Sequence, residues 1–286
     1  MKTIIITGAN GQLGKKIKDL SDDYTEFNYI FTDYKELDIT KEQNVNDFFE
    51  KTKPHCVINC AAYTQVDKAE EEAELAYAVN ADGPENLAQA CTTHNAELIH
   101  VSTDYVFGNS KQNHPFGEDD PTAPNSVYGK SKDAGEKKLK AFKRTRIVRT
   151  AWLYSEHGNN FLKTMLRLGN EREELKVVYD QISTPTYAGD LADALLRLAQ
   201  QPSRPNAECE ILHYTNEGVC SWYDFAYEIF RQTEINCQLK PITTEAYPTP
   251  AKRPPYSVLD KSKIKEKYQI KIPDYRESLY ICLNLL

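Results

Sequence analysis

The sequence predicts an α/β protein built on a doubly wound parallel sheet, with a smaller lobe formed by the C-terminal part of the chain. Three observations lead to this fold class. The first 150 residues alternate short β-branched runs with longer amphipathic segments, as consecutive βαβ units do. A glycine-rich turn follows the first run, and the alternation becomes irregular after Trp152.

Five apolar runs in the first half are short enough, and apolar enough, to be strands that helices cover on both faces. They are residues 3–7, 29–33, 56–60, 97–101 and 146–149. The segments between them carry apolar residues at helical spacing, with charged residues opposite, and are predicted as crossover helices. These segments are residues 13–20, 41–51, 69–94 and 127–142. The right-handed crossover rule then places helices on both sides of a twisted sheet.

The organisation predicted is a nucleotide-binding domain over residues 1–152 and a mainly substrate-binding lobe over residues 153–286, with a helix near 188–201 packed back on the first domain. A second helix is expected over 221–233, because Ser221 and Asp224 have the spacing of a capping box before an apolar run. The Pro-rich stretch 241–255 is predicted to be extended. The basic cluster 137–146 is interpreted as a solvated helix face.

The composition is that of a folded, acidic protein. Apolar residues make up 40% and charged residues 27%, and the formal charge is -7. An acidic chain gives no general attraction for phosphate backbones, so no nucleic-acid partner is expected. Seven cysteines without a C-x-x-C pair indicate neither a disulfide framework nor a zinc site. We expect a cytoplasmic protein with no membrane span, because no apolar run approaches the length of a membrane helix.

The strongest local signal is the turn from Thr7 to Gly14, with the spacing Gly-x-x-Gly-x-x-Gly between the first strand and the first helix. Glycines at such a turn permit unusual backbone angles, close approach of a pyrophosphate and tight packing of helix on strand. The N-terminus of the helix then faces the phosphates. This context predicts a dinucleotide site and a Rossmann-type domain, whereas Ala9 and Lys16 do not fit a P-loop.

The preference between nicotinamide cofactors stays open at the sequence level. Asp33 ends the second predicted strand, where an acidic side chain meets the adenosine ribose hydroxyls and favours NAD. Lys35 lies just beyond it and would offset a 2′-phosphate. Asp38 and Ile39 are candidates for the edge of the adenine, although a surface aspartate that begins a turn is nearly as good an interpretation of Asp38.

Tyr128 and Lys132 lie four residues apart at the start of a predicted helix, on one face. An ammonium near a phenol is expected to lower the phenol's pKa toward the working range of an acid–base catalyst. Thr103 and Asp104 directly follow the fourth strand, at the sheet edge where open α/β sheets bind ligands. Asn80 is either a holder of water beside Lys132 or a core amide.

Together, these motifs resemble the extended short-chain dehydrogenase/reductase family. Within it, four segments are similar to the dTDP-4-dehydrorhamnose reductases: Ala61-Ala62-Tyr63-Thr64 with Val66-Asp67, Ser102 to Phe107, Arg149 to Tyr154, and Arg253-Pro254. The resemblance covers nearly the whole chain. It implies NADPH- or NADH-dependent reduction of the 4-keto group of dTDP-4-dehydro-L-rhamnose to dTDP-L-rhamnose, a step in making a cell-envelope sugar donor.

The resemblance also implies the roles of individual residues. Tyr128, Lys132 and Thr103 would be catalytic, and Thr103, Asp104, Tyr105, Trp152 and Arg253 would contact the dTDP-sugar. Arg253 would lie on its diphosphate, although a surface salt bridge is an equally good interpretation of this residue. The expected cofactor-binding residues extend from the glycine turn to the catalytic helix: Gly8, Asn10, Gly11, Gln12, Leu13, Gly14, Asp33, Lys35, Asp38, Ile39, Ala61, Ala62, Tyr63, Thr64, Asn80, Tyr128 and Lys132.

One departure from the family pattern concerns metal and oligomer. Some members dimerise through magnesium held by carboxylates, one of them early in the first helix, where this chain has Lys15 and Lys16. Two ammonium groups do not ligate a hard cation, so no metal ligand is assigned, and magnesium and a homodimer stay open. Two other functions also stay open: an epimerase acting on a nucleotide sugar, and a non-catalytic regulatory subunit of the methionine adenosyltransferase β type.

Overall fold

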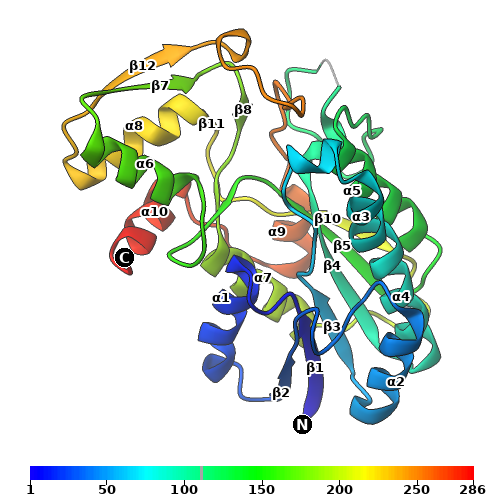
Figure 1. Cartoon of the computed structure of the whole chain (residues 1–286). Helices are drawn as coiled ribbons and strands as arrows, with labels where there is room; N and C mark the ends of the chain where they lie inside the picture. Colours follow the sequence, from blue (N-terminus) through cyan, green and yellow to red (C-terminus); the bar gives the residue numbers. More distant parts are fainter. Residues whose placement is uncertain (110–111) are drawn as a thin grey trace.

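A computed structural model describes residues 1–109 and 112–286. Its main sheet has six parallel strands in the order β10-β5-β4-β3-β1-β2, with α-helices on both faces (Figure 1). The doubly wound parallel fold is therefore confirmed. The strands are β1 (Lys2–Thr7), β2 (Phe27–Phe31), β3 (Cys56–Asn59), β4 (Glu97–Thr103), β5 (Thr145–Thr150) and β10 (Glu210–His213).

The direction of winding changes beside β1. The chain runs outward from β1 to β2 and then returns to β3 on the other side of β1. A crevice at the carboxyl ends of the strands forms at such a switch point, and ligands bind there in open α/β sheets. The glycine turn leaves β1 at this point.

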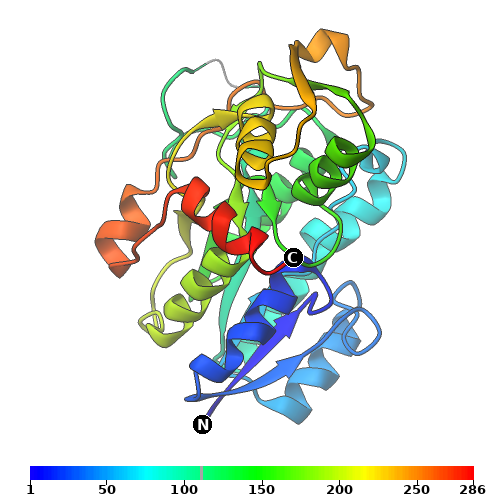
Figure 2. The same ribbon diagram turned by 90° about the vertical axis from the view of Figure 1, so that its left-hand side faces the viewer.

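Two helical layers cover the main sheet. On one face α1 (Gln12–Leu20) packs against α7 (Ala188–Gln200), and Figure 2 looks onto these two helices. On the other face lie α2 (Glu42–Thr52), α4 (Gly83–Thr93) and α5 (Val127–Leu139). The central strands β3, β4 and β5 are almost entirely buried between these layers, which explains their apolar runs. The buried strands β4 and β5 also carry charged side chains, which pair with one another or with a helix.

The helix expected over 69–94 is interrupted in the structure. It consists of a 3-10 turn at Lys68–Glu70, α3 (Ala73–Tyr77), a π-helical turn at Ala78–Asp82, and α4. Pro84 has no N–H to continue a helical ladder and stands in the first turn of α4. The spacing of apolar residues along the segment does not predict the π-helical turn between α3 and α4.

The C-terminal part of the chain forms a smaller layered unit beside the sheet edge. Its α8 (Trp222–Thr233) begins with the predicted capping box of Ser221 and Asp224. The other elements are β6 (Leu153–Tyr154), α6 (Phe161–Glu171), β7 (Glu174–Val178), β8 (Ile182–Ser183), β9 (Thr186–Tyr187), β11 (Cys220–Ser221), β12 (Gln238–Ile242) and α10 (Tyr275–Leu283). The helix α9 (Ser262–Tyr268) instead packs against β10, and its Ile264 belongs to the core of the main sheet.

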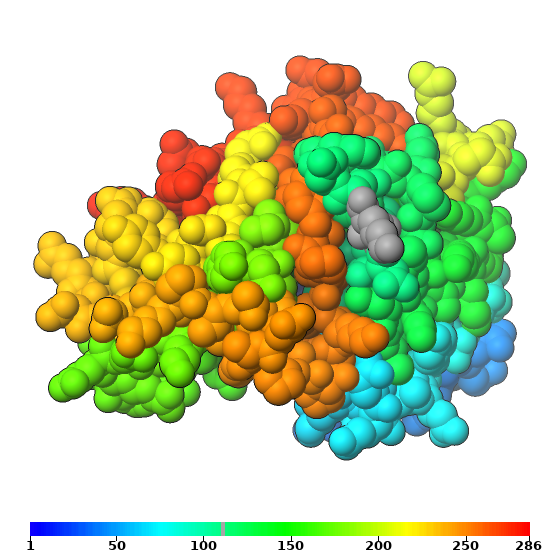
Figure 3. Space-filling model, turned by 90° about the horizontal axis from the view of Figure 1, so that it is seen from above, coloured from blue at the N-terminus to red at the C-terminus, as the bar shows by residue number. Residues whose placement is uncertain are grey.

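Three pairs of these short strands form two-stranded sheets: β7 with β12, β8 with β11, and β6 with β9. Pro241 lies inside β12 at a sheet edge, and the rest of the Pro-rich stretch is irregular except for a 3-10 turn at Thr244–Ala246. Seen from above, this orange segment lies between the C-terminal unit and the main domain (Figure 3). The stretch is extended in part, as predicted.

Two features of the fold were not expected. The chain returns to the main sheet after α7, where β10 pairs with β5. β10 has four residues, of which two are apolar, so its sequence is too short to predict a strand. In the basic cluster, Lys137 and Lys138 lie in ion pairs on the surface of α5, but Arg146 is completely buried against Glu97. The solvated-face interpretation is therefore wrong for Arg146, because it lies on central strand β5.

Two further expectations concern the whole chain. All seven cysteines are free thiols. Over residues 1–109 and 112–286, no helix is both long and apolar enough to cross a membrane.

Candidate active site

A pocket of about 680 Å³ lies at the carboxyl ends of β1, β3, β4 and β5. Its lining reaches from the glycine turn to the C-terminal unit and includes most of the predicted site residues. These are Gly8, Gly11, Gln12, Leu13, Gly14, Asp33, Asp38, Ile39, Ala61, Ala62, Thr64, Thr103, Asp104, Tyr105, Tyr128, Lys132 and Trp152. Its volume lies within the range of sites for cofactor-sized ligands.

The glycine turn forms a cradle that leaves no room for side chains. Gly8 has a φ of +62°, and a Cβ there would lie 2.7 Å from the backbone nitrogen of Ala61. A Cβ on Gly14 would lie 2.5 Å from the carbonyl oxygen of Gly8. Gly11 is the N-cap of α1, so the free N–H groups of that helix face the pocket. This cradle fits a pyrophosphate group.

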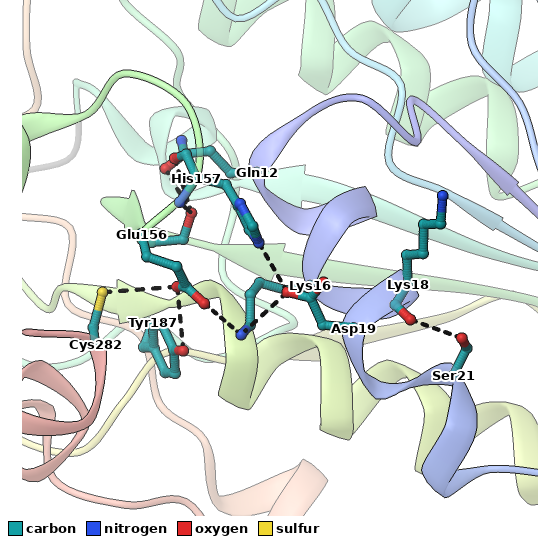
Figure 4. A network of polar contacts seen from close by, with 10 residues as sticks. Gln12, Lys16, Lys18, Asp19, Ser21, Glu156, His157, Tyr187 and Cys282 are labelled. Atoms are coloured by element: carbon teal, nitrogen blue, oxygen red, sulfur yellow. Dashed lines mark hydrogen bonds and ion pairs between the residues drawn. The ribbon is translucent and has the colours of Figure 1, made fainter. Parts of the chain in front are cut away.

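The side chain of Gln12 links the cradle to the loop after β6. Its Oε1 accepts hydrogen bonds from Asn160 Nδ2 at 2.8 Å and from Ser155 Oγ at 3.3 Å. One turn further along α1, Lys16 Nζ lies 2.6 Å from Glu156 Oε1 (Figure 4). Polar contacts therefore tie α1 to residues 155–160, of which Asn159 and Asn160 line the pocket.

Lys16 also bears on the question of a metal. Within the described residues, Asp19, Glu156 and His157 form a group whose ligand atoms lie within 4.8 Å of one another. The Lys16 ammonium lies in this group, 3.5 Å from Asp19 as well. Although burial alone would lower it, hydrogen bonds to Glu156 and Tyr187 raise the pKa of Lys16. A permanent cation therefore already neutralises these carboxylates.

The residues after β2 that were expected to contact the adenosine ribose and adenine differ in their placement. Asp33 lines the pocket, and its carboxylate accepts the backbone N–H groups of Asn10 and Tyr34 at 3.1 and 2.8 Å. Asp38 also lines the pocket, but its carboxylate accepts two hydrogen bonds from Thr40, which hold its pKa below the usual range. Lys35 is exposed, and neither it nor Asn10 is part of the lining.

Tyr63 and Asn80 lie behind the pocket wall. Asn80 Oδ1 accepts the N–H of Tyr63 at 2.9 Å, and its Nδ2 donates to the Tyr63 carbonyl and to Ser131 Oγ, both at 3.0 Å. The Tyr63 hydroxyl donates to Glu72 at 2.5 Å. Asn80 is completely buried, so these contacts are those of a core amide that fixes the loop after β3 against α5.

Thr103 and Tyr128 approach the pocket from different elements. Thr103 is the last residue of β4, and Tyr128 lies in the first turn of α5, where the Ser126 hydroxyl caps the helix. Burial raises the pKa of Tyr128 to about 12, with a hydrogen bond to Thr103 acting in the opposite direction. The Tyr128 phenol therefore keeps its proton at neutral pH.

Lys132 is completely buried below Tyr128. Its Nζ donates to the Val101 carbonyl at 2.7 Å and lies 3.3 Å from His100 Nε2. Burial lowers the pKa of Lys132 to about 8, and burial together with Lys132 holds the pKa of His100 well below 6.5. The expectation that the ammonium lowers the pKa of Tyr128 is not met, because these contacts turn the amine toward β4.

Asp104 is a buried carboxyl group in the pocket lining, next to Thr103. It accepts hydrogen bonds from Ser257 Oγ at 2.5 Å and from Thr103 Oγ1 at 3.2 Å. Burial raises its pKa to about 6 despite these bonds. Ser257 belongs to the segment after the Pro-rich stretch, so Asp104 joins the main sheet to the C-terminal unit.

Trp152 and Arg253 have different positions. Trp152 lines the pocket, and its ring is stacked on that of Trp222 with centroids 3.6 Å apart. Arg253 lies outside the lining and forms a two-pronged ion pair with Asp67, with N–O distances of 2.7 and 2.8 Å. Its guanidinium is thus already bound to a carboxylate.

Sequence reasoning missed several lining residues. Trp222 is the clearest, and a signal for it was present: it is one of two tryptophans in the chain and directly follows the helix cap Ser221. Asn160 and Tyr34 also line the pocket. No motif marks these two, because a single polar or aromatic residue in a loop is common.

Comparison with known proteins agrees with this geometry. The family model described as the RmlD substrate binding domain matches residues 1–286. A dTDP-4-dehydrorhamnose reductase of Aggregatibacter actinomycetemcomitans is 43% identical, covering 98% of this chain and 97% of that protein. The enzyme of the same name from Escherichia coli K12 is 37% identical, with 99% and 97% covered.

Solved structures give the same result. A dTDP-4-dehydrorhamnose reductase of Clostridium acetobutylicum is 48% identical with a TM-score of 0.91, covering 99% of each chain. One of Bacillus anthracis, in complex with NADP, is 40% identical with a TM-score of 0.93 and full coverage of both chains. A Thermus thermophilus UDP-glucose 4-epimerase, 19% identical with a TM-score of 0.78 over 99% and 98% of the two chains, shares the fold alone. This chain therefore belongs to the dTDP-4-dehydrorhamnose reductase family and is an oxidoreductase with the extended short-chain dehydrogenase/reductase fold.

Proposed function

We propose that this protein uses NADPH or NADH to reduce the 4-keto group of dTDP-4-dehydro-L-rhamnose, which yields dTDP-L-rhamnose for cell-envelope polysaccharide. The observation that carries the proposal is that Thr103, Tyr128 and Lys132 line the same pocket as the glycine cradle. Full-length relatives named for this activity support the substrate.

We assign the cofactor to the part of the pocket between the glycine turn and Lys132. The cradle of Gly8, Gly11 and Gly14 would hold its pyrophosphate, because Gly11 caps α1 and leaves the free N–H groups of that helix at the pocket. Asp33 would bind the adenosine ribose, and Ala61, Ala62 and Thr64 would line the central part. Asn10, Lys35, Tyr63 and Asn80 would act from outside the lining. The bound cofactor supplies the hydride.

The chain's own residues supply the proton and the polarisation. Burial raises the pKa of Tyr128 to about 12, so the phenol is protonated at neutral pH. It would donate this proton to the substrate oxygen as the carbonyl is reduced. The Thr103 hydroxyl would hydrogen-bond the same carbonyl. Lys132, with a pKa near 8, carries a proton at neutral pH and would bind the nicotinamide ribose and return a proton toward Tyr128.

The sugar nucleotide would lie at the other end of the pocket. Asp104 and Tyr105 would position sugar hydroxyls, and Trp152 would form an apolar wall. Arg253 would bind the diphosphate while it shares its guanidinium with Asp67, whose pKa this ion pair lowers. In this proposal residues 1–152 with the helix α7 hold the cofactor, and residues 153–286 mainly hold the substrate.

Location, assembly and metal complete the proposal. Seven free thiols fit a reducing cytoplasm. We propose that the protein needs no magnesium, because the Lys16 ammonium already lies between Asp19 and Glu156. A homodimer stays open as its assembly.

The test is the absorbance of reduced nicotinamide while the 4-keto dTDP-sugar is added with NADPH or NADH, with and without magnesium. We expect rapid oxidation that is independent of magnesium. Tyr128→Phe should lower turnover about 100-fold or more through loss of general acid catalysis. The matched control is Tyr24→Phe, which removes a hydroxyl bound to Asp193. Failure of the wild-type protein to oxidise either cofactor would favour an epimerase or a regulatory subunit.

A further inference from the structure

The two tryptophans of the chain form one stacked pair at the rim of the pocket. Trp152 follows β5 of the main sheet, and Trp222 is the first residue of α8 in the C-terminal unit. Their ring centroids are 3.6 Å apart with 12° between the planes, and both side chains line the pocket. The stack is a direct aromatic contact between the two parts of the molecule across the site.

The backbone of Trp152 is unusual. Its φ is +45°, in the left-handed region that a bulky side chain rarely adopts. The surroundings hold this conformation, because the Trp152 carbonyl accepts the N–H of Thr186 at 3.1 Å and the next residue enters β6. Such outliers persist only where neighbouring structure determines them, and they cluster at ligand sites. The conformation directs the indole to the pocket rim.

Trp222 is fixed independently of Trp152. The capping box holds the start of α8, with Ser221 N–H donating to Asp224 at 2.9 Å and Asp224 N–H donating to Ser221 Oγ at 3.1 Å. Trp222 also has Phe161 of α6 as a neighbour, with the two ring centroids 4.6 Å apart. The indole of Trp222 is therefore a rigid support built by the C-terminal unit.

We propose that Trp222 is a positioning residue that sets substrate affinity: it braces the Trp152 indole so that Trp152 presents an apolar wall to the C–H face of a 6-deoxyhexose. The stack covers one face of Trp152, and the indole as a whole is only partly buried and lines the pocket. An indole face suits the C–H groups and methyl of a deoxysugar and offers nothing to an additional hydroxyl. The inference rests on the proposed function.

The test compares Trp222→Ala, Trp222→Leu and Trp222→Phe with Tyr227→Ala. Tyr227 lies on the same helix and is 56% exposed, so it controls for the loss of an aromatic ring from α8. We expect the alanine and leucine variants to raise the KM for the 4-keto sugar nucleotide about two- to tenfold, the range for loss of an aromatic pair. The kcat and the Kd for NADPH should change less than twofold, and phenylalanine should largely restore the KM.

A binding measurement separates this inference from the proposed reaction. In Trp222→Phe the only tryptophan left is Trp152, so tryptophan fluorescence reports on Trp152. We expect added dTDP-L-rhamnose to quench this fluorescence, with a Kd close to that of the wild type. Trp222→Leu, which keeps apolar bulk, should bind this ligand more weakly by the same factor as its KM. Unchanged affinity in the leucine variant, or an equal loss of NADPH binding, overturns the inference. If the wild type binds dTDP-L-rhamnose but does not oxidise NADPH with the 4-keto sugar, the proposed reaction is overturned; weaker binding by Trp222→Leu would then still support the bracing role.

Discussion

Replacement of Asp104 by asparagine should change how the stability of the protein depends on pH. In the folded protein, burial raises the pKa of Asp104 from 3.8 to about 6, whereas the unfolded chain keeps the ordinary value. The folded state therefore binds more protons between pH 4 and 6, and the contribution of Asp104 to stability falls as pH rises through this window. Above pH 6 the full cost of burying the charge is present.

The magnitude follows from the shift. A difference of about two pKa units, at about 1.4 kcal/mol for each unit, corresponds to about 3 kcal/mol. Asparagine carries no charge and still accepts a hydrogen bond from Ser257. Relative to the wild type, Asp104→Asn should therefore gain about 3 kcal/mol of unfolding free energy between pH 4 and pH 7.

Urea unfolding at several pH values measures this difference directly, because groups common to both proteins cancel. The control is Asp120→Asn: the Asp120 carboxylate accepts the Gly117 N–H at 2.8 Å, and its pKa is lowered. That variant should lose stability relative to the wild type as pH rises. A difference between wild type and Asp104→Asn that stays constant from pH 4 to 7 would refute the reasoning.

Three further predictions follow from the same contacts. Gly14→Ala should weaken NADPH binding at least about tenfold in calorimetry, because its Cβ would overlap the turn, while Gly117→Ala, whose Cβ would have only one neighbour at 3.9 Å, should not. Turnover should decline as pH rises through about 8, where Lys132 loses its proton; a flat profile from pH 7 to 9 would contradict its role as an ammonium. Glu136→Gln, which removes the charge paired with buried Arg149, should cost about 3–5 kcal/mol in urea unfolding, and a loss below 1 kcal/mol would show that the pair is dispensable.

Local patterns predicted much of the fold and of the cofactor site. The alternation of strands and helices, the glycine spacing and the capping box at Ser221 all depend on residues within about eight positions of one another. Backbone geometry over such distances is set by local sterics and hydrogen bonds, which the order of residues specifies. Tyr128 and Lys132 are likewise joined by one helical turn. The helical spacing within α5 was therefore enough to predict that both residues lie on the same wall of the pocket.

The sequence by itself thus determined the doubly wound sheet, the glycine cradle and the edge at which a ligand site forms. Only the tertiary structure decided that Trp222 stacks on Trp152, that Ser257 binds Asp104 and that the Lys132 amine turns to His100. These pairs join residues 32 to 153 positions apart, and the pKa of a buried group depends on all the atoms packed around it. Periodicity along the chain carries no record of such neighbours, because they meet only when separate elements pack together.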